Sequence, residues 1–167
     1  MSNWLRGIIG VGMVVGFIFF GGCSDDDPTA PDTGSVSGTV TFVGTWPASR
    51  EVQVSIYQNL SAPYIPMAAP DGFTDPIASG TTTYNYTIEG LEKGTYTAIY
   101  VSARDPQNPA ATQLIGMYWQ FTDSVGVFPT PQGNLPDQAF GPKSVTIDND
   151  NIDLTGLNIV ANLNYSP

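Results

Sequence analysis

The chain has 167 residues, and its 15 acidic against 5 basic side chains give a formal net charge of −10. No histidine occurs in the sequence, which excludes Ser-His-Asp and Cys-His catalysis and His-based zinc sites. With so few basic residues, no patch could follow a phosphate backbone, so nucleic acid is not expected as a partner. The 18 glycines, 14 prolines and only 12% charged residues favour an all-β domain with many turns.

The first 22 residues have the layout of a signal peptide. Arg6 precedes an uncharged apolar run, residues 7–22, that ends in two glycines. The run is short for a transmembrane helix, which needs about 20 apolar residues. Residues 20–23, Phe-Gly-Gly-Cys, resemble the bacterial lipobox, although Phe20 replaces the usual leucine. The resemblance implies cleavage before Cys23 and acylation of Cys23, which anchors the protein stably when two or more chains are attached.

Ser24, Asp25, Asp26 and Asp27 follow the expected lipidation site. Serine after the lipidated cysteine is compatible with sorting to the outer membrane of Gram-negative bacteria, and the three acids resemble a tag for export to the cell surface. The alternatives are a solvated spacer with the domain in the periplasm, an ordinary cleaved leader, or an uncleaved signal anchor. We therefore expect a signal peptide at 1–22, a lipidated acidic tether at 23–34 and one domain at 35–167.

The first half of the domain shows the alternation of apolar and polar residues that predicts β-strands. Residues 35–43 and 51–58 each predict a strand. Residues 82–103 predict a hairpin, two strands that reverse at a turn between Gly90 and Gly94. The long loop at 59–81 has four large apolar residues that we expect to pack back on the rim of the domain: Tyr64, Ile65, Met67 and Phe73.

The second half continues the pattern. Residues 113–121 predict a strand with apolar residues on both faces, and Gly116 suggests a bulge or a close backbone approach. A second long loop covers 122–142. A short strand at 144–147, a turn and a last strand at 156–164 bring the expected total to seven, as in Greek-key β-sandwiches of this size.

Three segments resemble the carboxypeptidase-regulatory-like domains, a group of transthyretin-like β-sandwiches: GSVSGTVTFVG at 34–44, VQVSIY at 52–57 and YTIEGLEKGTYTAIYV at 86–101. The resemblance covers roughly residues 35–103 and implies a single seven-stranded Greek-key β-sandwich. Domains of this group have no activity of their own and act as accessory or recognition modules. The resemblance thus indicates a fold and leaves the function open. The features that carry it are Gly38, Tyr86, Ile88, Leu91, Gly94, Thr95 and Tyr96.

Catalytic residues are not expected, and the protein is predicted not to be an enzyme. The single thiol, Cys23, is assigned to lipid, and no Gly-rich loop leads into a helix that could hold phosphate. Two carboxylates across a cleft can hydrolyse glycosides. However, Glu89 and Glu92 flank the expected turn, where charged side chains are usually only solvated.

Two groups of residues could form a binding site, and each also has a structural explanation. Asp148, Asp150 and Asp153 offer carboxylates for Ca²⁺, but the EF-hand order is absent and a turn between strands is preferred. An aromatic platform for sugar or peptide could include Trp46, Tyr64 and Trp119, with Tyr118 and Phe121 beside them, although core filling is the commoner role of such residues. Trp46, next to a proline in a connection, is the best exposed candidate.

The expected protein is therefore a non-catalytic outer-membrane lipoprotein, a binding or structural accessory module of the envelope. Its partners would be the membrane, through the lipid, and another envelope protein or a glycan. No cofactor is expected besides the covalent lipid, and Ca²⁺ is not the favoured interpretation. The alternatives are a carbohydrate-binding module of a surface glycan-uptake system and a calcium-dependent adhesin.

Overall fold

The computed structural model describes residues 33–61, 64–126 and 141–164 of the chain. Within these ranges the fold is all-β, and the helical structure is one short 3₁₀ turn, η1. None of the described segments forms a helix that is long and apolar enough to cross a membrane. The elements are β1 (Thr33–Val43), β2 (Glu51–Tyr57), β3 (Gly72–Phe73), β4 (Thr83–Glu92), β5 (Gly94–Tyr96), β6 (Ala98–Arg104), η1 (Pro109–Ala111), β7 (Gln113–Met117), β8 (Val145–Ile147), β9 (Asp153–Leu154) and β10 (Ile159–Asn162).

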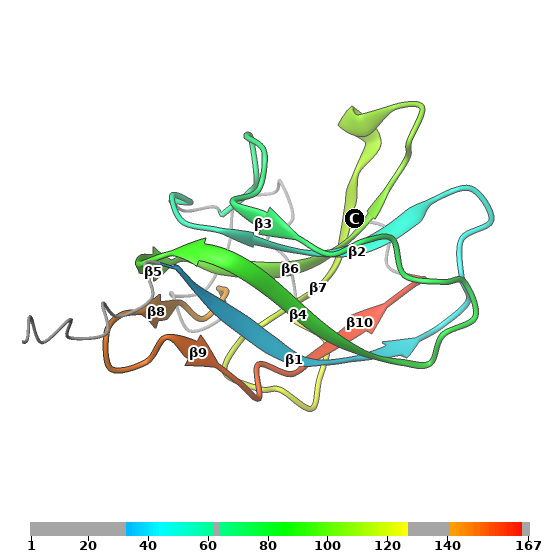
Figure 1. Cartoon of the computed structure of the whole chain (residues 1–167). Helices are drawn as coiled ribbons and strands as arrows, with labels where there is room; N and C mark the ends of the chain where they lie inside the picture. Colours follow the sequence, from blue (N-terminus) through cyan, green and yellow to red (C-terminus); the bar gives the residue numbers. More distant parts are fainter. Residues whose placement is uncertain (1–32, 62–63, 127–140, 165–167) are drawn as a thin grey trace, which may run out of the picture.

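Most strands belong to one curled, mixed sheet with the order β3-β2-β6-β7-β10-β1-β4, to which β9 adds beside β1. β1 runs parallel to β10 and antiparallel to β4. The sheet curls so far that its two ends meet. The contact lies at Gly72 of β3, where a Cβ atom would be 2.6 Å from the Cγ2 atom of Ile88 in β4. In Figure 1 the β2–β6 half and the β1–β4 half accordingly face each other across the interior. β5 and β8 form a separate two-stranded sheet.

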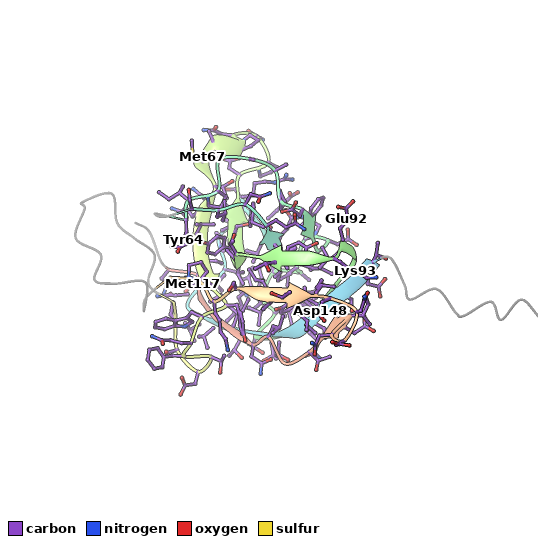
Figure 2. All side chains as sticks on the ribbon, turned by 90° about the vertical axis from the view of Figure 1, so that its left-hand side faces the viewer. Tyr64, Met67, Glu92, Lys93, Met117 and Asp148 are labelled. Atoms are coloured by element: carbon purple, nitrogen blue, oxygen red, sulfur yellow. The ribbon has the colours of Figure 1, made fainter. Side chains whose placement is uncertain are left out.

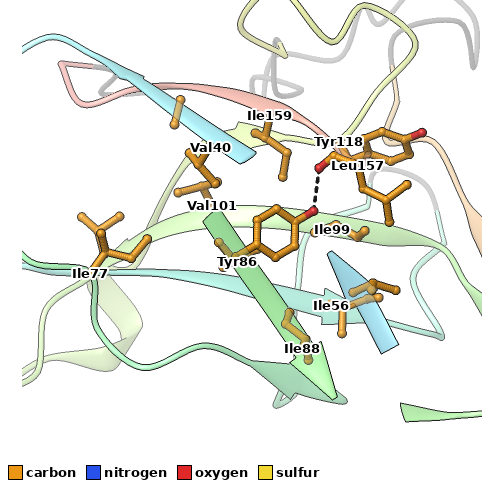
Figure 3. Packing of buried hydrophobic residues seen from close by; sticks show 14 of the residues in the cluster. Val40, Ile56, Ile77, Tyr86, Ile88, Ile99, Val101, Tyr118, Leu157 and Ile159 are labelled. Carbon is orange, nitrogen blue, oxygen red and sulfur yellow. Dashed lines mark hydrogen bonds between the residues drawn. The ribbon is translucent and has the colours of Figure 1, made fainter. Parts of the chain in front are cut away.

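The core fills the inside of this curl (Figure 3). Alternation predicts its members correctly in β1 and β2, where every second residue is apolar and faces inward. Tyr86, Ile88 and Leu91 close the core from β4. The fully buried aliphatic residues of the first two strands are Val36, Val40, Val52, Val54 and Ile56.

One hydrogen bond in the core joins the two halves of the chain. The Tyr86 hydroxyl donates to the backbone oxygen of Leu157 at 2.6 Å, and Tyr86 is only 2% exposed (Figure 3). The Leu157 N–H donates to the Ser37 oxygen at 3.1 Å. The Leu157 peptide occupies the space that a side chain at Gly38 would take, since a Cβ there would lie 2.2 Å from the Leu157 oxygen. Gly38 thus allows a backbone segment, rather than a side chain, to fill this part of the core.

The predicted hairpin at 82–103 is wrong in its pairing, although both strands exist. β4 pairs with β1, whereas β6 lies between β2 and β7. Gly90, at φ +71°, does not reverse the chain. It belongs to a bulge, because the register of β4 against β1 shifts by one residue between Gly34 and Val36. The chain then crosses through β5 from one half of the sheet to the other.

Tyr96 stabilises this crossing. Its hydroxyl donates to the oxygen of Glu92, four residues earlier, at 2.8 Å, and the residue is 1% exposed. In immunoglobulin-type sandwiches a tyrosine near the start of a strand makes the same backward bond at a corner between sheets. Tyr96, which the sequence predicts to lie in the second strand of a hairpin, therefore belongs to a corner.

The strand at 113–121 is shorter than predicted, but the expectation for Gly116 is confirmed. A Cβ at Gly116 would lie 2.9 Å from the Cβ of Ala161 in β10, so the two backbones approach closely. A register shift between Val101 and Ser102 adds a bulge at this point in the pairing of β6 with β7. Burial on both faces is confirmed too, because Ile115 belongs to the main core and Met117 to a second cluster.

The second cluster lies on the outer face of the sheet and explains why β6 is buried on both sides. Ile99 and Val101 face the main core, while Ala98 and Tyr100 point the other way. Tyr57, Leu60 and Leu114 pack against the second cluster, whose fully or nearly fully buried members are Ala98, Tyr100, Met117 and Trp119. This cluster covers one part of the outer face of β2, β6 and β7, and a groove occupies another.

Candidate functional site

A groove of about 770 Å³ lies over the outer face of β2, β6 and β7. The loop at 64–70 and Phe73 form one wall, and η1 with the residues that follow it forms the other. The two loops project from the same side of the sheet in Figure 1. The floor consists of side chains of alternate strand residues, which lie opposite the core residues of the same strands. These floor residues are Gln53, Ser55, Tyr57, Ser102, Arg104 and Leu114.

The floor carries polar groups that are themselves buried. Gln53 is 8% exposed and its Nε2 donates to the Thr74 oxygen at 2.9 Å. Burial raises the pKa of the Tyr57 hydroxyl, and a side-chain hydrogen bond with Ser55 partly opposes this shift. Gln53 Nε2 and the Tyr57 hydroxyl thus have partners within the protein, and a ligand in the groove meets polar as well as apolar groups.

The start of the wall formed by the loop at 64–70 is held by a hydrogen bond from the second cluster. The buried Tyr100 hydroxyl donates to the backbone oxygen of Tyr64 at 2.7 Å. Tyr64 has φ +61°, the one positive value among the described non-glycine residues, and such a conformation costs about 1 kcal/mol or more. Burial also raises the pKa of Tyr100, so its hydroxyl remains a neutral donor. The wall therefore has a fixed starting point over the second cluster.

The opposite wall is fixed by Arg50. Its Nη1 donates to the Ala103 oxygen at 3.2 Å and to the Ala111 oxygen at 2.6 Å. These two bonds tie the end of η1 to the end of β6. The charge of Arg50 is thus used to hold the backbone of the wall, and Arg50 does not line the groove.

Apolar side chains of the first wall are exposed, which corrects the expectation that they pack back on the domain. Ile65 is 45% exposed, Met67 91% and Phe73 61%. Figure 2 shows Met67 at an outer corner of the domain, away from Lys93 and Asp148. Single exposed apolar residues are common on protein surfaces, whereas three large ones beside one groove indicate a binding surface.

The charges of the groove differ from those of the whole chain. Arg104 is the one charged residue among the described residues that line it, and none of them is Asp or Glu. The Nη2 atom of Arg104 donates to Glu51 at 2.9 Å, with both side chains more than a third exposed. Exposed pairs of this kind contribute between about 0 and 1 kcal/mol, so Arg104 can accept a further partner at little cost.

The three predicted aromatic contact residues are not brought together, and Trp46 and Trp119 lie away from the groove. Trp46 is half-buried, its ring centroid is 5.0 Å from that of Phe42, and its Nε1 donates to the Thr81 oxygen. Trp119 is 6% exposed and its Nε1 donates to the Ser124 oxygen. Tyr64 borders the groove only through its neighbour Ile65.

The predicted calcium ligands form a turn and are divided between two contacts. The Oδ1 atom of Asp148 accepts from the backbone N–H groups of Asp150 and Asn151, at 3.0 and 2.9 Å. Asp153 instead accepts from the Ser35 hydroxyl at 2.8 Å. In the part of the chain that the structure describes, no three metal-ligating side chains gather closely enough to hold an ion.

We expect Ca²⁺ to leave the stability of the domain unchanged, because the best-placed carboxylate oxygen, Asp148 Oδ1, already accepts hydrogen bonds within its own turn. A ligand that binds only the native state must raise the melting temperature. The measurement is thermal unfolding with Ca²⁺ in excess and with chelator. A rise of several degrees that Asp148→Asn removes would instead establish a calcium site.

The predicted lipidation and sorting residues, Cys23 and Ser24 to Asp27, lie outside the described residues. No protein-family model, curated protein or solved structure matches the chain.

Sequence reasoning missed the groove because its floor residues carry no motif. Ser55 and Ser102 follow the alternation of ordinary strands, and only the pairing of β2 with β6 makes them neighbours on one face. The available signal was the length of the loop at 59–81, since loops of that length in a compact domain are often functional.

Proposed function

We propose that this protein is a non-catalytic binding module, anchored by lipid at Cys23 in the outer membrane of a Gram-negative bacterium, and that its ligand binds in the groove. The observation that carries the proposal is the groove itself, with exposed apolar side chains on one wall and polar groups on its floor. Binding sites for small or extended ligands combine these two features.

The position of the groove agrees with a tether at the N-terminus. β1 starts at Thr33, opposite Glu92, and ends at Val43. Residues 44–50 then lead directly to Glu51, which pairs with Arg104. The Arg104 end of the groove therefore lies at the end of the domain remote from Thr33. A lipid-anchored domain would present this end away from the membrane.

The tether is long enough for this arrangement. Ten residues, Cys23 to Asp32, precede β1, and an extended chain of that length spans at most about 35 Å. The domain would remain near the membrane and still be free to turn. Surface display, rather than the periplasm, is the orientation we propose, because of the acidic run Asp25 to Asp27.

For the fold in finer detail, we propose a transthyretin-like Greek-key sandwich. The Tyr96 corner, the close approach at Gly38 and the curled sheet support this assignment. The step from β4 through β5 to β6, which carries the chain from one half of the curled sheet to the other, also supports it.

The anchoring proposal predicts that protease treatment of intact cells releases peptides of the domain. It also predicts that mass spectrometry finds acyl chains on Cys23 and on the new amino terminus. The matched control is Cys23→Ser, which should carry no acyl chains and should not reach the cell surface. An acylated but protected domain would place the protein in the periplasm, and an unmodified Cys23 would refute the lipoprotein assignment.

A carbohydrate-binding module is the second candidate, and the exposed ring of Phe73 beside the groove favours it. Glycan arrays with the folded domain test it. Binding that Phe73→Ala removes and Trp46→Ala preserves would support a sugar site in the groove. Binding lost only with Trp46→Ala would place the sugar elsewhere.

A further inference from the structure

We propose that the groove binds an extended peptide segment of another protein. The segment has aliphatic side chains and an Asp or Glu residue, whose carboxylate accepts hydrogen bonds from Arg104. This inference rests on the proposed function, because it names the ligand of the same groove. Three properties of the groove support it: the charge of its lining, the polarity of its floor and the chemistry of its walls.

The charge of the lining favours an acidic group at one end of the ligand. The protein has three times as many acidic as basic residues, yet Arg104 is the one charged residue among those described that line the groove. A guanidinium has five N–H donors in a planar fork, and the contact with Glu51 engages only Nη2. Arg104 can therefore hold a ligand carboxylate while it keeps Glu51.

An acidic side chain fits better than a chain terminus. The side chain of Arg104 is 45% exposed, so the end of the groove is open to solvent there. A ligand chain can continue past it in either direction. The carboxylate then comes from a residue within the chain.

The floor argues against a purely aliphatic ligand such as an acyl chain. Gln53, Ser55 and Ser102 are between 5% and 8% exposed and lie under the groove. Gln53 already donates to Thr74 and Ser55 is hydrogen-bonded with Tyr57. An acyl chain would still offer no hydrogen bond to Ser102 or to the remaining lone pairs of this floor, whereas water does. A peptide offers an N–H and a C=O group at each residue.

The walls argue against a sugar as the main ligand. Sugar sites rely on flat, exposed aromatic rings, and of the aromatic residues lining the groove only Phe73 is largely exposed. Most of the wall is aliphatic, with Ile65, Pro66 and Met67 among its members. Methionine is unbranched and adapts to varied apolar partners, as binding of peptide side chains requires.

The test is a displayed library of random dodecapeptides selected on the folded domain, followed by affinity measurements on the enriched peptides. We expect aliphatic residues around one Asp or Glu. Replacement of that acid by its amide should weaken binding about tenfold, as for one partly exposed charge-assisted hydrogen bond. Amidation of the peptide's own carboxyl terminus should have no effect.

Protein variants separate the contribution of Arg104 to peptide binding from that of the apolar wall. Arg104→Gln should weaken binding of the acidic peptide about tenfold and leave the amide peptide unaffected. Lys93→Gln, which changes the charge equally between β4 and β5, is the matched control. Met67→Ser should weaken both peptides alike.

Two results would overturn the inference in different ways. If acid and amide peptides bind equally well and Met67→Ser weakens both, the groove is a binding site but its acidic specificity is wrong. If selected peptides bind and no groove variant changes their affinity, or if neither peptides nor glycans bind at all, the proposed function of the groove fails as well.

Discussion

Replacement of Gly38 by alanine is expected to lower the melting temperature of the domain by roughly 10 °C. The new Cβ would lie 2.2 Å from the oxygen and 2.6 Å from the carbonyl carbon of Leu157. These are backbone atoms, so no flexible side chain can move aside. Overpacking of this kind costs about 3 kcal/mol, and each kcal/mol shifts the midpoint of a domain of this size by about 3–5 °C. Thermal unfolding followed by circular dichroism measures the effect.

Gly80→Ala is the control for this prediction. Gly80 has φ +87°, and a Cβ there would meet nothing within 4 Å. Its cost is only that of a non-glycine residue in the left-handed region, about 1 kcal/mol. Gly38→Ala should therefore be clearly the more destabilising. Equal losses for the two variants would mean that the Leu157 peptide does not lie against Gly38.

The sequence alone predicts the strands well because alternation is a local signal. β1 and β2 match the expected 35–43 and 51–58 within two residues at each end. Every second residue of these strands faces a single core, so each window of the sequence contains enough information to identify the strand. The turn at Asp148 is predicted for the same reason, since its hydrogen bonds span only three residues.

Strand pairing could not be predicted in the same way. Tyr86 and Tyr100 lie close in sequence, in two segments of period two that Gly90 and Gly94 separate, and this pattern predicts a hairpin. In the structure Tyr86 packs in the main core and Tyr100 on the outer face. The difference depends on which distant strands lie beside each one, β1 for Tyr86 and β2 with β7 for Tyr100. No short window of sequence carries that information.

The prediction that Trp46 is the best exposed aromatic candidate is wrong, because exposure depends on tertiary contacts. Trp46 follows a glycine and a threonine in a connection, and such segments usually face solvent. Its indole instead packs on Phe42 and donates to Thr81, 35 residues away. Phe73 has a similar local context, yet its ring is the one left exposed beside the groove.

Tyr86→Ala is expected to destabilise the domain by about 3–5 kcal/mol, as for other large aromatic residues removed from a core. Tyr86 is 2% exposed, and its ring lies among residues from both halves of the sheet (Figure 3). Tyr86→Phe keeps the ring and removes only the hydroxyl that donates to Leu157. We expect it to cost about 1–3 kcal/mol, because the buried carbonyl is left without this donor. Urea unfolding of the three proteins compares them.

The two largest effects should be coupled, because both variants act on the same carbonyl group. In Gly38→Ala the Leu157 peptide must move, which already breaks or weakens its bond from Tyr86. Tyr86→Phe should then cost less in the Gly38→Ala background than in the native protein, by about 1 kcal/mol or more. Paired with Gly80→Ala, the same substitution should be additive to within about 0.5 kcal/mol. Full additivity in both cycles would show that Gly38 and Tyr86 stabilise the domain independently, and that Leu157 does not link β1 to β4.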